Sequence, residues 1–389
     1  MMQHNKKILG ICYTNNISRF DTLPYDLDIF TLNKELDKFP VYKNYSKNKF
    51  FYTFKNAKLN LFTKLLHGVN LFFKIIRLVL SEKYDCFIFI TPPYFHFLLY
   101  PILRFFKKNT VTIVADAYYH ITKDKSFDNY LLYVLRRILF PIYFMQEYLS
   151  IRFSSAVFTN SFFLYEVHKK WNKNTFYTPN GADVKTIVAS DIKKYCKCDY
   201  IIYIGSFSPF RGVELLIEAF KLLKISYKKP IKLVLMGNYG EQEKFLRNLA
   251  KNEKDIIFAG FVPIPEMYSY VKAAKIGVIP NYNTITSQTI SSNKGFIYIA
   301  AEIPQVVTDS GDHAHWTNKL KTGLITKPII EDISSNMMKL LTDKRVYNEL
   351  RKNCINKRQL VDYPTVKIPL INYLNELNKS KIKWQMKTN

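Results

Sequence analysis

The chain has 389 residues, of which 48% are hydrophobic and 23% charged, and 57 lysines and arginines against 31 acidic residues give a net charge of +26. This length accommodates about two domains, each with its own core. An aromatic content of 16% excludes a disordered chain, and five cysteines are too few, and odd in number, for a disulfide scaffold.

The N-terminal end shows no pattern of a secretory signal. Its first apolar run, Ile8–Tyr13, is too short for export and has no small-residue cleavage site after it. We therefore expect a cytoplasmic protein with reduced thiols. Cys196 and Cys198 form a close pair, but no second Cys/His pair stands nearby to complete a zinc site, so we expect no metal there.

The segment Cys86–Phe106 is apolar enough to be mistaken for a membrane span. Three prolines, Pro92, Pro93 and Pro101, interrupt it, whereas a spanning helix needs about 20 continuous residues. Its β-branched and aromatic beginning predicts a buried strand, a turn and a helix instead.

Short apolar runs alternate with longer amphipathic segments along the whole chain. Strands are predicted at Ile8–Tyr13, Cys86–Ile90, Val111–Ala115, Ala156–Thr159, Tyr200–Ile204, Lys232–Met236, Ile256–Ala259, Ile276–Pro280 and Gln305–Thr308. Helices are predicted at Leu59–Ser81, Phe95–Phe106, Tyr130–Phe153, Phe162–Trp171, Gly212–Leu223, Glu241–Asn252, Pro265–Ala273, Gly295–Ala301 and Ile330–Leu341. Continuous apolar strands separated by helices indicate an α/β fold with two Rossmann-like domains built on parallel sheets.

The domain boundary is expected near the turn Pro179–Gly181, which is followed by a polar, lysine-rich stretch. We place the first domain at residues 1–185, the second at 186–362, and a C-terminal helix with a basic tail at 363–389. A helical pattern at Ile368–Leu377 leaves two placements open: packed back across the first domain, or lying on a surface.

A candidate anion site lies where the second domain begins. A predicted strand ends at Gly205, and a helix starts near Gly212, so that backbone N–H groups and the positive end of the helix dipole point at one place. Arg211 would add a bidentate donor for phosphate oxygens. The alternative is that Arg211 is an exposed loop cation.

The segment Arg211–Phe220 (RGVELLIEAF) resembles the start of the C-terminal domain in GT-B glycosyltransferases of the family-4-like group, the glycosyl transferases group 1. That family usually has Lys where this chain has Arg211, and many members carry a second basic residue where this chain has Ser206. The resemblance covers most of residues 84–310 and is strongest from 177 onward. Further similar segments are Tyr177–Asp183, Lys232–Gly240, Phe258–Val262, Ala273–Pro280 and Ser291–Val307.

The resemblance implies two facing Rossmann-like domains, with a nucleotide sugar bound to the second and an acceptor to the first. It implies a UDP- or GDP-sugar as donor, with no metal or other cofactor. The donor-binding residues that it implies are Gly205, Ser206, Arg211, Gly237, Ser292, Asn293 and Lys294. For Lys294 the alternative is a solvated residue at the start of a helix.

Three positions depart from the family pattern. The acidic residue that grips the donor ribose falls on Ile297, with Thr289 eight residues earlier in place of the other glutamate, and the family's glycine falls on Glu302. Three explanations stay open: other groups hold the ribose, the donor preference is altered, or the protein is inactive.

Two sets of side chains are candidates for the chemistry. Asp116 and His120 follow a predicted strand, and relatives often carry Asp and His in this loop; they are our candidate catalytic residues. The alternative is that Asp116 caps a turn and His120 packs. His313 and His315 could suggest a metal, but we expect a surface loop there.

The charge is spread evenly, with +13 on residues 1–185 and +13 on 186–389. An even spread speaks against one nucleic-acid patch, no nucleic-acid-binding motif is present, and we expect no nucleic-acid partner. An anionic membrane surface is a possible partner. The segment Tyr130–Phe153 could lie on that surface or be a core helix.

These observations predict a glycosyltransferase that moves a sugar from a nucleotide diphosphate to a hydroxyl of a glycan or lipid-linked acceptor. We expect it to act in surface polysaccharide or glycoconjugate synthesis, in the cytoplasm or peripherally on the inner face of a membrane. The alternative is a degenerate GT-B protein that serves as a non-catalytic binding or scaffold partner.

Overall fold

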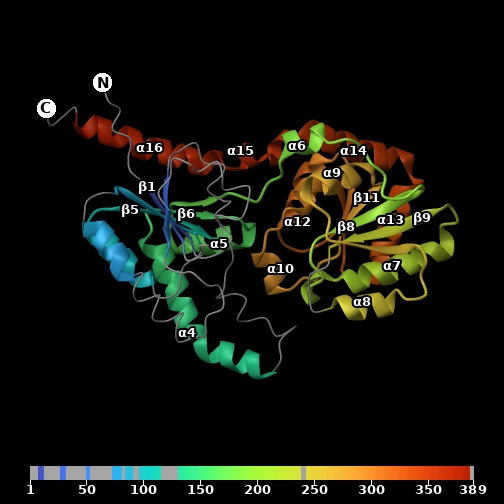
Figure 1. Ribbon diagram of the computed structural model, residues 1–389, viewed down its shortest axis with the longest axis horizontal. Coiled ribbons are helices and arrows are strands. Elements are labelled where there is room, and N and C mark those ends of the chain that lie inside the picture. The colour runs from blue at the N-terminus through green and yellow to red at the C-terminus, as the bar shows by residue number, and fades with distance from the viewer. Residues whose placement is uncertain are drawn as a thin grey trace.

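The computed structural model describes residues 8–12, 27–31, 50–52, 72–80, 84–90, 96–114, 130–237 and 242–385. Within them, two parallel sheets, each flanked by helices, lie side by side (Figure 1). This arrangement confirms the prediction of two Rossmann-like α/β domains.

The first sheet has seven parallel strands in the order β3-β2-β1-β4-β5-β6-β7. Every residue of β4 and β6 is buried, as expected for central strands covered on both faces. The strands are β1 Ile8–Cys12, β2 Leu27–Thr31, β3 Phe50–Tyr52, β4 Cys86–Ile90, β5 Asn109–Val114, β6 Ala156–Thr159 and β7 Thr175–Tyr177. The helices around it are η4 His96–Leu98, α2 Leu99–Phe105, α4 Tyr130–Phe153, α5 Phe162–Trp171 and a helix at residues 72–80.

The second sheet has six parallel strands in the order β10-β9-β8-β11-β12-β13. Its strand order reverses between β8 and β11, and in such sheets ligands bind at the carboxyl ends of the strands beside this point. The strands are β8 Asp199–Ile204, β9 Ile231–Met236, β10 Ile256–Gly260, β11 Ile276–Ile279, β12 Gln305–Thr308 and β13 Gly323–Thr326. Its helices are α6 Val184–Ala189, η5 Pro209–Arg211, α7 Val213–Ser226, α8 Glu243–Leu249, α9 Ile264–Ala273, α10 Ile285–Thr289, α11 Lys294–Ala300, α12 Gly311–Leu320, α13 Ile330–Thr342, α14 Lys344–Lys357 and η6 Arg358–Val361.

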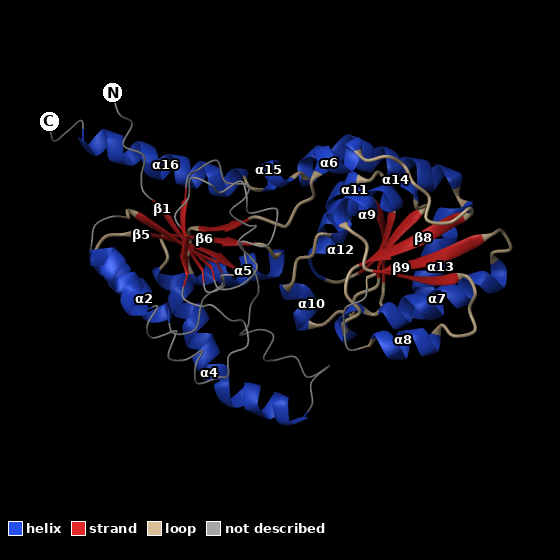
Figure 2. Ribbon diagram, in the orientation of Figure 1, coloured by secondary structure: helices blue, strands red, loops and turns tan. Residues whose placement is uncertain are grey.

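The C-terminal segment returns to the first domain through α15 (Tyr363–Val366) and α16 (Ile368–Gln385), which runs along that domain in Figure 2. Leu370 and Leu374 of α16 are each 1% exposed and join the core formed by β4, β5 and β6. Of the two placements that the sequence left open, the helix therefore takes the one packed across the first domain.

Every strand predicted from the sequence is present, each within two residues of its expected bounds. Cys86–Phe106 forms strand β4 and helix α2, as predicted. In the described part of the chain, none of the helices has the length and apolar character needed to cross a bilayer.

Glu302 has an unusual backbone conformation at the end of α11. Its φ is +64°, in the left-handed region that favours glycine, and it follows the last helical turn, where helices commonly end with glycine. Its carboxylate pairs with Arg358 and lies 3.7 Å from Arg351. This backbone position thus suits the glycine of the family pattern, and the ion pairs of Glu302 offset part of the strain.

We expect Glu302→Gly to be more stable than Glu302→Ala by about 1 kcal/mol, because both lose the ion pairs and only glycine relieves the left-handed backbone. Urea unfolding of the two variants beside the wild type measures this difference. Equal midpoints for the two variants would contradict the left-handed assignment at residue 302.

Candidate functional site

Two glycines shape the carboxyl edge of the second sheet. Gly205 follows β8 and Gly237 follows β9, with φ values of +125° and +147°. A Cβ on Gly237 would lie 2.1 Å from the carbonyl oxygen of Gly205, and one on Gly205 would lie 2.5 Å from Cε of Lys294. The bare backbone therefore lets the two strand ends approach each other and admits the side chain of Lys294 against Gly205.

Lys294, the first residue of α11, is only 6% exposed. Its Nζ donates to the hydroxyl of Tyr203 at 2.7 Å and lies 4.1 Å from the centre of that ring. Burial, and then the charge of Arg211, hold the pKa of Lys294 well below its usual value. The alternative of a solvated residue at a helix start is therefore wrong.

Arg211 is also buried, at 9% exposure, in the turn η5 that precedes α7. Its guanidinium lies 4.7 Å from the ring centre of Phe210, and its Nε has no hydrogen-bond partner. Burial lowers the pKa of Arg211. The alternative of an exposed loop cation is wrong as well.

The two cations share one feature, which is that neither Arg211 nor Lys294 forms a salt bridge with a carboxylate among the described residues. A buried charge without a partner is costly, and an anionic ligand offsets that cost. Both side chains stand at the carboxyl end of β8, beside the point where the strand order reverses. This place can bind an anion with more than one negative charge.

His313 completes one side of the site. It is 3% exposed on α12, and its Nε2 lies 2.7 Å from Oγ of Ser292. Burial, followed by the charges of Lys294 and Arg211, lowers its pKa to about 3, so the ring is neutral at pH 7. A neutral imidazole fixes the hydroxyl of Ser292 without adding charge.

The expectation of a surface loop at His313 and His315 is wrong, because both residues lie on α12. His315 stacks on the ring of Phe162 with centres 4.4 Å apart. The segment is poor in apolar residues, which concealed the helix. An aspartate in the first turn, Asp312, was the sequence signal that could have revealed its start.

Two other predicted donor residues, Ser206 and Asn293, form hydrogen-bond contacts of their own. Oγ of Ser206 lies 3.3 Å from Oγ of Ser208. Asn293 donates from Nδ2 to the hydroxyl of Tyr363 at 2.9 Å, and thus ties the start of α11 to α15.

Two of the departures, Ile297 and Thr289, leave the site without a carboxylate at the positions where the family has one. Ile297 is 9% exposed and packs in the core of the second domain. Thr289 is fully buried, and its hydroxyl donates to the carbonyl of Thr286 at 3.1 Å. Asp116 and His120, the candidate catalytic residues, lie outside the described residues, and their role stays a prediction.

Asp312, next to His313 in the first turn of α12, joins the two domains. It is 1% exposed; one carboxylate oxygen accepts from the backbone N–H of Phe162 at 2.7 Å and the other from the hydroxyl of Tyr177 at 3.0 Å. Trp316 donates from Nε1 to the same hydroxyl at 2.6 Å. The carboxylate thus satisfies an N–H at the start of α5, in the other domain, that has no partner within its own helix.

Two further hydrogen bonds cross between the domains beside this carboxylate. Oγ of Ser161 donates to the carbonyl of Gln288 at 2.6 Å, and Nδ2 of Asn180 donates to the carbonyl of Ser291. Ser291 directly precedes the predicted donor residues 292–294. The domain contact and the candidate anion site therefore share the segment 291–294 and the first turn of α12.

Comparisons with known proteins agree with this geometry. Residues 190–360 match the family model described as glycosyl transferases group 1. A search of curated protein sequences found no match. Solved structures similar in fold include sucrose-phosphate synthase from Thermosynechococcus elongatus, with a TM-score of 0.72 at 14% identity over 97% of this chain and 100% of that chain.

Two other structures are similar over comparable lengths. Anabaena HepE in complex with UDP has a TM-score of 0.67 at 15% identity, covering 95% of this chain and 100% of that one. WaaG, a glycosyltransferase involved in lipopolysaccharide biosynthesis, has a TM-score of 0.62 at 14% identity, covering 93% and 97%. The chain therefore has the GT-B fold, and residues 190–360 resemble the glycosyl transferases group 1 family.

Proposed function

We propose that this protein transfers a sugar from a UDP- or GDP-sugar to a hydroxyl of a glycan or lipid-linked acceptor, in the synthesis of a surface polysaccharide or glycoconjugate. The observation that carries the proposal is the pair of buried cations, Arg211 and Lys294, which have no carboxylate partner among the described residues. A diphosphate is an anion of the size and charge that would offset both. The bound UDP in HepE supports this choice of ligand.

The proposed mechanism uses the two cations where charge develops. As the bond between sugar and diphosphate breaks, negative charge grows on the leaving group, and Arg211 and Lys294 stabilise it in a water-poor setting. The neutral His313 holds the hydroxyl of Ser292, which is one of the proposed donor-binding residues. Asp116 and His120 are the proposed groups that take the proton from the acceptor hydroxyl.

Thermal shift with a panel of nucleotides tests the proposal. We expect UDP or GDP to raise the melting temperature, by an amount equivalent to about 3 kcal/mol at a hundredfold excess over Kd. UMP and GMP should act much more weakly, because they lack the second phosphate. Repeating the panel with UDP- and GDP-sugars identifies the base and the sugar.

The second candidate function is a non-catalytic GT-B protein, which the lack of a carboxylate at Ile297 and Thr289 favours. It is supported if no nucleoside diphosphate changes the melting temperature. A nucleotide shift accompanied by release of nucleoside diphosphate from the sugar donor, in the presence of acceptor, would rule it out.

We also propose a cytoplasmic location, peripheral to the inner face of a membrane. A lipid-linked acceptor is held in that membrane, and an enzyme that uses it works at the membrane surface. The name of WaaG, whose fold is similar, places that protein in lipopolysaccharide biosynthesis, in keeping with such an acceptor.

A further inference from the structure

A basic groove runs along the first domain at the amino ends of β5, β6 and β7. It consists of two adjoining cavities of about 490 Å³ and 410 Å³, which share Arg152, Asn172 and Asn174. Asp and Glu are absent from the lining of both cavities. The cations that line them are Arg104, Lys107, Lys108, Arg152, Lys170 and Lys173.

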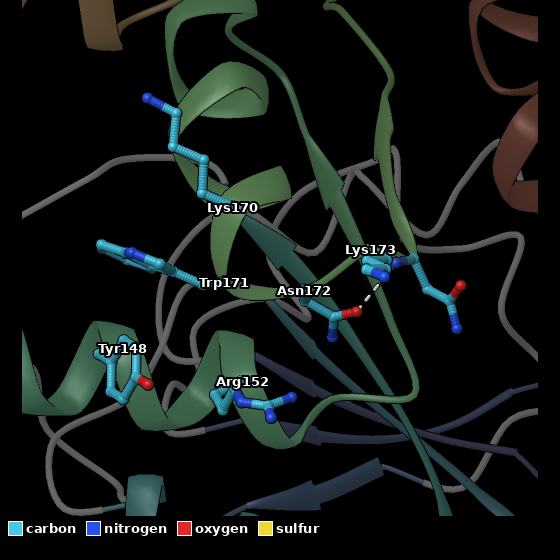
Figure 3. A pocket seen from close by; sticks show the side chains of 7 residues that line it. Tyr148, Arg152, Lys170, Trp171, Asn172 and Lys173 are labelled. Carbon is cyan, nitrogen blue, oxygen red and sulfur yellow. Dashed lines mark hydrogen bonds between the residues drawn. The ribbon is translucent and has the colours of Figure 1, made fainter.

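The walls of the groove come from separate elements. Figure 3 shows Tyr148 and Arg152 of α4 on one side and Trp171 and Lys173, at the end of α5, on the other. The rings of Tyr148 and Trp171 are 5.5 Å apart in an edge-to-face arrangement. Because the groove lies at the amino ends of the strands, it is on the edge of the sheet opposite to the carboxyl ends, where α/β folds bind their substrates.

The turn after α2 places two aromatic rings beside these cations. Phe105 is 81% exposed and Phe106 is 42% exposed, with ring centres 5.4 Å apart. The next residue, Lys107, has a φ of +53°, a left-handed conformation that favours glycine. A lysine in this conformation costs backbone strain. Such strained residues are typical of functional sites.

Helix α4 continues this surface. After Pro141, the exposed side chains of Ile142, Met145 and Arg152 fall on one face of the helix by their spacing. Ile142 is 50% and Met145 51% exposed, while Arg152 lines both cavities. An apolar stripe therefore leads directly into the basic groove.

We propose that this surface, made of the groove, the turn at residues 104–108 and the exposed face of α4, docks the first domain on an anionic lipid bilayer. A bilayer surface offers phosphate groups to the cations and an apolar layer to the phenylalanine rings, at the depth where aromatic rings and cations meet. A soluble phosphate or a nucleic acid would leave Phe105 and Met145 exposed. This docking surface is separate from the donor site. The proposal rests on the proposed function only for the statement that the bilayer holds the acceptor.

Vesicle co-sedimentation of the full-length protein tests the proposal. The vesicles contain phosphatidylcholine alone or with 30% phosphatidylglycerol, at low and high salt, without nucleotide. The double variant Lys107→Gly/Lys173→Ala removes two exposed cations, and glycine suits the backbone at residue 107. Phe105→Ser removes the most exposed ring. The matched control, Lys251→Ala/Lys254→Ala, removes two exposed lysines of the second domain.

We expect binding to the anionic vesicles only, weakened by salt. Each cation near an anionic surface contributes about fivefold, so the double variant should bind roughly 25-fold more weakly. Phe105→Ser should also weaken binding, and the control should bind like the wild type. The thermal shift with nucleotides should be unchanged in all variants, so that a failure of docking is distinguishable from a failure of the proposed function.

Three outcomes would overturn the proposal. One is the absence of wild-type binding to anionic vesicles, and another is an equal loss in the control. The third is binding that Phe105→Ser leaves unchanged while a short RNA duplex competes for the same lysines, because this would identify a nucleic-acid surface.

Discussion

Lys294→Met is expected to abolish tight donor binding while leaving the ligand-free protein as stable as the wild type, or more stable. In the ligand-free protein the ammonium is buried and pairs with no carboxylate among the described residues. Methionine fills a similar volume without the cost of holding a charge away from water, so the ligand-free protein loses no stability from the missing charge. Tyr203 keeps a partner, because its hydroxyl also donates to the carbonyl of Ser206 at 2.6 Å.

The loss in transfer should be much larger than any change in stability. Removing one group that stabilises developing charge lowers turnover by about 100- to 1,000-fold. The melting temperature without ligand, its rise with UDP or GDP, and the turnover of the cognate donor are the three measurements. If the melting temperature without ligand rises or stays the same, while the nucleotide shift and the turnover are lost, Lys294 is a ligand-binding cation and not a structural one.

Lys352→Met is the matched control, since it removes the same charge from an exposed position on α14. It should leave the nucleotide shift and the turnover unchanged. Wild-type turnover in Lys294→Met would contradict the assignment of the donor site, whatever the effect on stability.

The central strands could be predicted because a parallel strand that is buried on both faces needs a continuous apolar run. Cys86–Ile90 and Ala156–Thr159 were predicted with the bounds that the structure has. Three of the strands that the sequence did not reveal, β3, β7 and β13, are at the edges of the sheets. Each is three or four residues long, and Gly323–Thr326 is not fully buried, so no long apolar run marks them.

For the candidate site, the sequence predicts which types of residue take part but not that they are buried. A basic residue before one helix and a lysine at the start of another indicated an anion site, but their burial depends on packing between distant segments. Lys294 is buried because it lies against Gly205 and Tyr203, about 90 residues earlier in the chain. The role of Asp312 was out of reach for the same reason, since its partner Phe162 is 150 residues away.

Asp312 should make the stability of the protein depend on pH between about 4 and 6. Burial raises the pKa of Asp312 from 3.8 to about 6, although the N–H of Phe162 and the hydroxyl of Tyr177 donate to it. The folded protein therefore holds this proton more tightly than the unfolded chain. The stability due to this group is complete below pH 4 and is lost as the pH rises to about 6, by roughly 3 kcal/mol in all.

Asp312→Asn isolates this effect, because asparagine has the same shape and no charge. Its carbonyl can accept from the N–H of Phe162, and its amide can donate to the hydroxyl of Tyr177. Urea unfolding between pH 4 and 8 should show the variant equal to the wild type at pH 4 and more stable by up to about 3 kcal/mol at pH 7. A difference between the two proteins that does not change with pH would mean that Asp312 does not titrate in this range.

Asp312→Ala should behave differently, because it removes the acceptor itself. The N–H of Phe162 would lose its acceptor, and the loss of one hydrogen bond costs about 1 kcal/mol at every pH. Tyr177 would keep only its hydrogen bond from Trp316. Since the neighbouring His313 holds Ser292 in the candidate donor site, loosening the start of α12 should also reduce the melting-temperature shift caused by nucleotide. The shift should survive in Asp312→Asn, so a reduction confined to alanine would show that the hydrogen bonds between the domains, and not the charge, support donor binding.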